Sequence, residues 1–168
     1  MGTGSFAAAE SRTAVAMLKS LLSAGISMQN AVDTANIALN LKGTGQSCVS
    51  LDILQINRYS GQSRICKAGG ANSFVISGGN SKMLSADSLP IGILKETKTA
   101  QLDFTLKNGD SVVLMSDGAK ADKKQVQTLT LMSQKCTAEE MTKQFIKGQD
   151  ADDDITVATI KLTRIHLH

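Results

Sequence analysis

Apolar positions recur at a helical spacing in the first quarter of the chain. One such pattern runs from Ser5 to Gly25, and a second begins at Ser27 and continues to Leu39. A serine at the start of each pattern is typical of a helix N-cap, and Gly25 is typical of a helix end. Because the connection between the two helices is so short, we expect an antiparallel helix pair.

The middle of the chain changes to the period of two that strands show. We expect strands over residues 49–56, 64–68, 73–77, 82–84, 102–106 and 112–115. A Gly-Gly-Asn turn at 78–80 joins two of these strands into a hairpin. The run from Val112 to Met115 is apolar throughout, as in a central strand that is buried on both faces.

A helical pattern returns near the C-terminus. Thr137 and Glu140 have the spacing of a capping box, and Met141 and Phe145 lie one helical turn apart. An acidic loop over 150–154 then leads into a last strand over 155–162. Strands that are grouped rather than alternating with helices predict an α+β fold, with helices flanking antiparallel sheets. The length predicts a single domain over residues 1–168.

Composition excludes several classes of function. A net charge of +3 and an aromatic content of 3% argue against a nucleic-acid-binding surface. Three widely spaced cysteines predict neither a disulfide framework nor a zinc site, and they favour a reducing, cytoplasmic setting. Both histidines lie in the last three residues, which argues against histidine-assisted nucleophilic catalysis. No apolar run approaches the roughly 20 residues of a membrane-spanning helix.

Acidic residues stand at the ends of two predicted strands. Asp117 follows the apolar strand in a Ser-Asp-Gly turn, which Gly118 allows to be sharp, and Asp153 and Asp154 precede the last strand. If these strands are antiparallel neighbours, the carboxylates meet at one end of the sheet. Such oxygen ligands, with no histidine or thiolate nearby, suit Mg²⁺ or Mn²⁺. Acidic turns are also common as solvated connections, so spacing alone leaves both interpretations open.

Five motifs occur in a fixed order along the chain. They are Met-Gly-Thr-Gly at 1–4, Ala-Ala-Ala-Glu-Ser at 7–11, Ser-Leu-Pro-Ile-Gly-Ile at 88–93, Ser-Asp-Gly at 116–118 and Asp-Asp-Ile-Thr-Val at 153–157. Lesser matches are Leu-Asp at 51–52, Ala-Gly at 68–69 and Phe74. With these motifs the sequence resembles the stage II sporulation E-like branch of the phosphatase 2C superfamily. The resemblance implies an α-β-β-α sandwich of two antiparallel sheets.

The resemblance also implies an activity, that of a metal-dependent protein serine/threonine phosphatase. Aspartates hold two Mn²⁺ or Mg²⁺ ions, and a metal-activated water attacks the phosphorus directly. By motif position, Asp117 and Asp153 are catalytic metal ligands, and Asp154 and Gly118 belong to the same metal site. The implied substrate is a phosphorylated bacterial regulatory protein such as an anti-sigma-factor antagonist. In relatives the first helix pair takes part in dimer contacts, so we expect a homodimer.

The chain departs from the family pattern at its start. There the family motif is Asp-Gly-Met-Gly, in which the Asp bridges both ions, and here Met1 stands at the internal Met. We therefore expect the bridging Asp and the strands before it to be missing, with weakened metal occupancy and turnover. The alternative is a non-catalytic pseudophosphatase that docks a phosphoprotein or dimerises. A dinucleotide site at the G-x-G-x-x-A match over 2–7 is disfavoured, because no strand precedes it.

Overall fold

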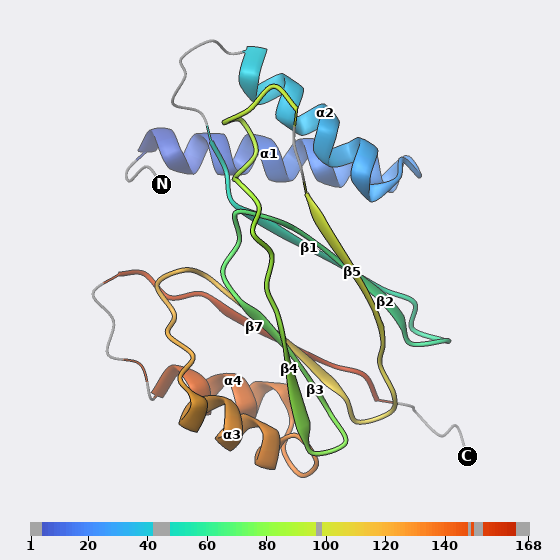
Figure 1. The fold of residues 1–168 in the computed structure, drawn as a ribbon, viewed down its shortest axis with the longest axis vertical. Coiled ribbons are helices and arrows are strands. Elements are labelled where there is room, and N and C mark those ends of the chain that lie inside the picture. The colour runs from blue at the N-terminus through green and yellow to red at the C-terminus, as the bar shows by residue number, and fades with distance from the viewer. Residues whose placement is uncertain (1–4, 42–47, 97–98, 148, 150–152, 164–168) are drawn as a thin grey trace. The chain divides into compact units, whose positions relative to one another are not determined.

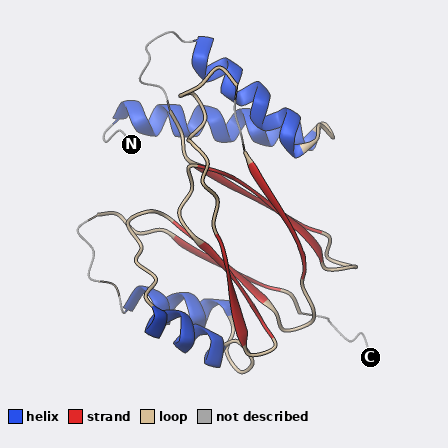
Figure 2. Ribbon diagram, viewed as in Figure 1, coloured by secondary structure: helices blue, strands red, loops and turns tan. Residues whose placement is uncertain are grey.

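The computed structural model describes residues 5–41, 48–96, 99–147, 149 and 153–163. The elements, labelled in Figure 1 and coloured by type in Figure 2, are α1 (Ser5–Ser23), α2 (Met28–Leu41), β1 (Leu51–Ile56), β2 (Gln62–Ala68), β3 (Ser73–Ser77), β4 (Asn80–Leu84), β5 (Ala100–Thr105), β6 (Ser111–Met115), α3 (Lys123–Met132), α4 (Ala138–Lys147) and β7 (Val157–Lys161). The strands form two sheets, in the orders β1-β2-β5 and β4-β3-β6-β7. The predicted α+β class, with antiparallel sheets and flanking helices, is confirmed.

The chain divides into two compact units. Unit 1 comprises Met1–Leu54, Ile65–Gly70 and Ala86–Leu102, and unit 2 comprises Gln55–Arg64, Ala71–Ser85 and Asp103–His168. Each unit has its own hydrophobic core, one around α1 and α2 and one around α3 and α4. The two units are therefore described separately.

In unit 1 the two predicted helices form, with the expected end of α1 at Gly25 and the expected start of α2 at Ser27. The predicted N-cap of the first helix, Ser5, is instead the first residue of α1. After α1, the backbone N–H groups of Gly25 and Ile26 donate to the carbonyls of Leu22 and Leu21, each at 3.1 Å. This Schellman arrangement requires the left-handed φ of 82° that Gly25 adopts. The hydroxyl of Ser27 accepts from the backbone N–H of Asn30 at 3.3 Å and begins α2.

The core of unit 1 joins both helices to the first two strands. Small buried residues on α2 let α1 and the sheet pack closely against that helix. The strand β1 is half-buried on both faces, apart from one exposed position. The buried members are Ala14, Leu18, Met28, Ala31, Val32, Ala35, Leu39, Val49, Cys66, Ala68 and Ile91. Cys66 lies in this core as expected, and burial raises the pKa of its thiol. Cys48, in contrast, is only half-buried and precedes β1.

In unit 2 the hairpin of β3 and β4 is tighter than predicted. Ser77 pairs with Asn80 across a turn made only by Gly78 and Gly79, whose φ values are 56° and 80°. Asn80 therefore belongs to β4 and not to the turn, because two glycines already supply both positive-φ positions of a two-residue loop. β3 continues the sheet by pairing antiparallel with β6.

Both helices of unit 2 begin with capping boxes. In α3 the Asp122 carboxylate accepts from the N–H of Gln125, whose side chain reaches back to the N–H of Asp122. In α4 Thr137 and Glu140 make the predicted reciprocal bonds. The bonds that the Glu140 carboxylate accepts from the N–H and the hydroxyl of Thr137 hold the pKa of Glu140 below its ordinary value, because they favour the charged form.

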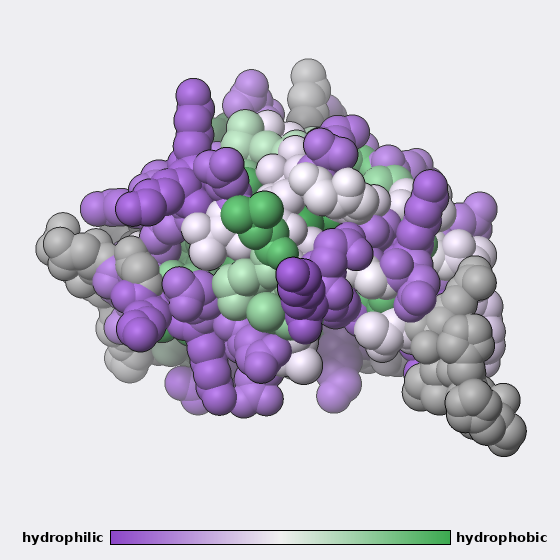
Figure 3. Space-filling view, turned by 90° about the horizontal axis from the view of Figure 1, so that it is seen from below, coloured by the Kyte–Doolittle hydropathy of each residue, from purple (hydrophilic) through white to green (hydrophobic). Residues whose placement is uncertain are grey.

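The inner faces of α3 and α4 cover one side of the four-stranded sheet. Met141 and Phe145 are buried there, as their spacing predicted, together with Phe74, Ile76 and Val113 from the sheet. Seen from the side of these helices, the surface is mainly hydrophilic around a small hydrophobic area (Figure 3). Unit 2 thus forms a layered helix-on-sheet structure with a solvated outer face.

Candidate metal-binding site

The two predicted acidic turns are neighbours at one end of the four-stranded sheet. β6 and β7 pair antiparallel, with Met115, the last residue of β6, opposite Val157, the first residue of β7. The ladder extends by one further bond, from the N–H of Ser116 to the carbonyl of Thr156 at 2.9 Å. The condition for bringing Asp117 near Asp153 and Asp154, namely antiparallel neighbouring strands, is therefore met.

The turn after β6 is held against the chain before β7 by further contacts. The Ser116 hydroxyl accepts from the N–H of Thr156 at 2.9 Å and lies 3.4 Å from the carbonyl of Asp154. A Cβ at Gly118 would stand 2.5 Å from that carbonyl oxygen and 3.4 Å from the Cβ of Asp153. Only glycine fits at position 118 without movement, so the absence of a side chain there brings the two turns together.

The carboxylates at this end of the sheet face solvent. Asp117, Asp153 and Asp154 are all exposed, and Oδ1 of Asp153 accepts a local hydrogen bond from the N–H of Asp154 at 2.8 Å. Exposed carboxylate oxygens on two adjoining strand ends are the donors that Mg²⁺ and Mn²⁺ prefer. The donor set therefore fits a divalent cation held from two sides.

The fit is partial. Among the residues that the structure describes, no group of three or more His, Cys, Asp or Glu side chains is arranged to hold a metal ion. Residues 150–152 of the acidic loop and the Met-Gly-Thr-Gly motif at 1–4 lie outside the described residues. The described residues therefore offer carboxylate ligands from two adjoining strand ends, and the occupancy of this site stays a prediction.

The motifs at 51–52, 68–69 and 88–93 meet in unit 1, where they form a partly buried polar cluster. The hydroxyl of Ser88 donates to the carbonyl of Lys67 at 3.0 Å and accepts from the N–H of Gly69 at 3.3 Å. Gly69 has a φ of 64°, and a Cβ there would stand 2.5 Å from Pro90. Gly70 packs so closely against Asp52 that a Cβ would overlap its carboxylate. These motif residues have structural roles in the described part of the chain.

Sequence reasoning missed the most deeply buried charge of this cluster. The Lys67 side chain is 0% exposed, and its ammonium group forms an ion pair with Asp52, which is 12% exposed. A Cys-Lys-Ala stretch in a strand gives no signal for a buried lysine, because lysine is mostly exposed. The signal that could have indicated it is Asp52, which lies fifteen residues earlier on the adjacent strand and can pair with Lys67.

A second polar feature that the sequence did not reveal is the amide of Asn36 on α2. Asn36 is 2% exposed, its side chain accepts from the N–H of Gly92 at 2.7 Å, and it donates to the carbonyls of Leu94 and Lys95 at 3.0 Å each. These bonds fasten α2 to the segment that follows the 88–93 motif. Asn36 is therefore a structural residue.

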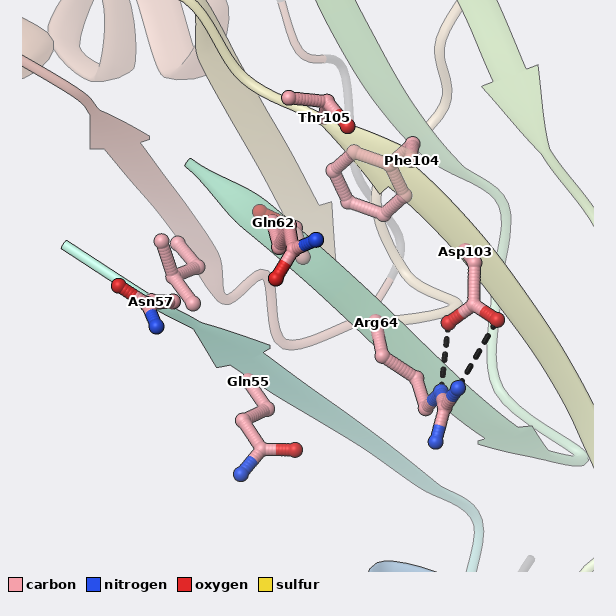
Figure 4. A pocket seen from close by; sticks show the side chains of 9 residues that line it. Gln55, Asn57, Gln62, Arg64, Asp103, Phe104 and Thr105 are labelled. Carbon is pink, nitrogen blue, oxygen red and sulfur yellow. Dashed lines mark hydrogen bonds and ion pairs between the residues drawn. The ribbon is translucent and has the colours of Figure 1, made fainter. Parts of the chain in front are cut away.

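A cavity of about 730 Å³ in unit 2 is lined by residues from β1, β2 and β5 (Figure 4). Its one lining cation, Arg64, already binds Asp103 through two bonds of 2.5 and 2.9 Å. The guanidinium holds the pKa of Asp103 below its ordinary value, and that carboxylate raises the pKa of Arg64. Since this pair is exposed and mutually neutralised, the cavity lacks a free cation that could bind a phosphate.

Comparison with known proteins places these features in a family. The model of the family "Stage II sporulation protein E (SpoIIE)" matches residues 1–163, across both units. The chain belongs to the stage II sporulation protein E family. It is 29% identical over 165 residues to the stage II sporulation protein E of Bacillus subtilis, covering 98% of this chain and 19% of that protein. The chain thus spans about a fifth of that relative's length.

Solved structures of this family and its neighbours share the fold. The PP2C phosphatase domain of SpoIIE from Bacillus subtilis, solved with a fragment of its regulatory domain, aligns with a TM-score of 0.76 at 26% identity, covering 96% of this chain and 52% of that one. RsbX in complex with magnesium aligns with a TM-score of 0.79 at 19% identity, covering 97% of this chain and 77% of that one. The PP2C-like fold expected from the motifs is confirmed. Within the described residues, no helix is long and apolar enough to cross a membrane.

Proposed function

We propose that this chain is a divalent-metal-dependent protein phosphatase that hydrolyses phosphoserine or phosphothreonine on a regulatory protein. The observation that carries the proposal is the meeting of two acidic turns, exposed to solvent, where β6 ends and β7 begins. Membership of a family of protein phosphatases supports the same reaction class.

Asp117 and Asp153 would hold Mg²⁺ or Mn²⁺ between the two turns, with Asp154 and Gly118 beside them. When bound, such an ion supplies a Lewis acid that offsets phosphoryl charge and makes water a better nucleophile. The protein's own part is to keep both carboxylates exposed and at the same end of the sheet. The bonds of Ser116 and the close approach of Gly118 to Asp154 serve this positioning.

The proposed partner is a phosphorylated regulatory protein such as an anti-sigma-factor antagonist, in a reducing cytoplasm. Cys48, Cys66 and Cys136 are all free thiols, which suits that setting.

Large apolar side chains on both helices of unit 1 are exposed, Val15 at 62%, Ile37 at 54% and Leu41 at 80%. This apolar exposure favours the further proposal of a homodimer formed through α1 and α2. It also supports the second candidate function, a non-catalytic docking or dimerising module.

The test is a calorimetric titration of Mn²⁺ into the protein and into an Asp117→Asn, Asp153→Asn double variant, combined with hydrolysis of p-nitrophenyl phosphate and a phosphoserine peptide. Glu139→Gln is the matched control, because Glu139 is an exposed carboxylate in the same unit that pairs with Lys143 on α4. We expect weak Mn²⁺ binding and slow hydrolysis in the protein and the control, and loss of both in the double variant. Binding without hydrolysis would favour the docking module, and no Mn²⁺ binding at all would overturn the proposal.

A further inference from the structure

A groove runs along the edge strand of the four-stranded sheet, between the β3–β4 hairpin and α3. Its volume is about 550 Å³, and Phe74, Met83 and Val126 make its apolar wall. Met83 is 52% exposed although it lies opposite the buried Phe74 in the hairpin. An exposed methionine beside a core phenylalanine leaves apolar surface open to a partner.

Backbone groups on the same strand are also open. β4 is the first strand in its sheet, and its register places Asn80 opposite Ser77 and Lys82 opposite Val75. In a hairpin with a two-residue turn these pairs exchange the backbone bonds, so the N–H and C=O groups of Ser81 and Met83 point away from β3. The side chains of Ser81 and Met83 line the groove. One strand edge therefore offers both main-chain bonds and an apolar wall.

The charges along this edge select the kind of segment that fits. Lys82 is exposed on the opposite face of β4. On the groove side Lys123 lies next to Asp122, whose carboxylate caps α3 by accepting from the N–H of Gln125. Two β4 strands that paired around Lys82 would bring like charges together, which disfavours a second copy of this chain. An added strand that alternates acidic and apolar residues would meet Lys82 on one face and Met83 on the other.

We propose that an extended acidic segment of the phosphoprotein substrate adds to β4 as a fifth strand of this sheet. The identification of the segment with the substrate rests on the proposed phosphatase function. Ala121 lines the groove only four positions after Asp117, at most about 14 Å of extended chain. A segment held on β4 would therefore present its phosphorylated residue beside the carboxylates.

The test measures binding of a labelled peptide of alternating valine and glutamate around one phosphoserine, by fluorescence anisotropy. Lys82→Glu should raise the Kd about tenfold, because attraction at the opposite position becomes repulsion. Ser81→Pro should weaken binding by a similar factor, since it removes an outward N–H on an edge strand, where proline is tolerated. The matched control is Lys135→Glu, the same charge change at an exposed lysine outside the groove, and it should leave the Kd within about twofold.

Hydrogen exchange and hydrolysis complete the test. Bound peptide should slow amide exchange at Ser81 and Met83, while hydrolysis of p-nitrophenyl phosphate stays unchanged in all three variants. The docking proposal would be overturned by any of three results. These are an unchanged Kd in Lys82→Glu, equal binding of a peptide with lysine in place of glutamate, and no saturable binding. Groove-dependent binding without any hydrolysis would instead leave docking standing and contradict the phosphatase, so the two failures are distinguishable.

Discussion

Aspartates occur in the motifs of both units, in opposite environments. In unit 1 Asp52 lies beside a fully buried lysine, and the segments 69–70 and 88–90 pack around them through glycine, serine and proline. In unit 2 Asp117 and Asp153 are exposed, and the bonds that join their turns are made by the backbone and the hydroxyl of Ser116 to Thr156. A carboxylate already neutralised by a buried ammonium group holds the fold together, whereas an exposed carboxylate remains available to a ligand.

The difference teaches that a residue shared with a family does not indicate chemistry by itself. The Ser-Leu-Pro-Ile-Gly-Ile motif is as much a part of the family pattern as the Ser-Asp-Gly motif, yet Ser88 and Pro90 serve to position the backbone around Gly69. Burial and partner identity separate the two roles. The comparison can be tested by substitutions, taken here from the largest expected loss of unfolding free energy to the smallest.

The largest loss is expected for Lys67→Met, which leaves Asp52 buried without its cation. Breaking a buried ion pair from one side costs about 3–5 kcal/mol, because an uncompensated charge stays in a low dielectric. Urea unfolding, followed by circular dichroism, gives the free energy. A combined Asp52→Asn, Lys67→Met variant is the control and should recover at least about half of the loss. Equal instability in the single and double variants would show that packing, and not charge, explains the effect.

The buried pair also marks where sequence-based prediction ended. Most helix and strand positions followed from periodicity, and the predicted capping box of α4 is present. The helix α3 and its capping box were not predicted, although Asp122 and Gln125 have the spacing that such a box requires. The meeting of Asp117 with Asp153 was predictable because two strand ends determine it. The Asp52–Lys67 pair and the groove beside β4 were not, because each depends on which side chains face each other in three dimensions.

A smaller loss of unfolding free energy is expected for Gly118→Ala, and this substitution should also affect the candidate metal site. The added Cβ would stand 2.5 Å from the Asp154 carbonyl, so the turns must separate, at about 1–3 kcal/mol. Mn²⁺ binding should weaken with it, since the carboxylates move apart. Gly79→Ala is a useful contrast, because its Cβ meets nothing within 4 Å although its φ is 80°. Gly79→Ala should strain the hairpin and leave Mn²⁺ binding intact; parallel loss of binding in both variants would contradict the proposed site.

Glu140, the capping carboxylate of α4, is an exposed acid with a structural role, and its effect on stability should depend on pH. Its folded pKa is below the ordinary value because it accepts from Thr137, so its contribution to stability is present above the unfolded pKa and disappears as the pH falls through the folded pKa. We expect the protein to lose stability below about pH 4.3 more steeply than Glu140→Gln, which cannot titrate. Urea unfolding at several pH values measures the two slopes. Identical slopes would remove Glu140 as a stabilising acid.

The smallest effect on stability is expected for Asp117→Asn. The Asp117 side chain is exposed and at the end of a strand, so the unfolding free energy should change by no more than about 0.5 kcal/mol. Under the proposed function the same variant loses Mn²⁺ binding, while Lys67→Met, measured where it remains folded, keeps it. Added Mn²⁺ should then raise the melting temperature of the protein but not of Asp117→Asn, because only a ligand of the native state stabilises it. Should Asp117→Asn unfold as readily as Lys67→Met, the Ser-Asp-Gly turn would have to be a structural element, and the contrast between the two units would fail.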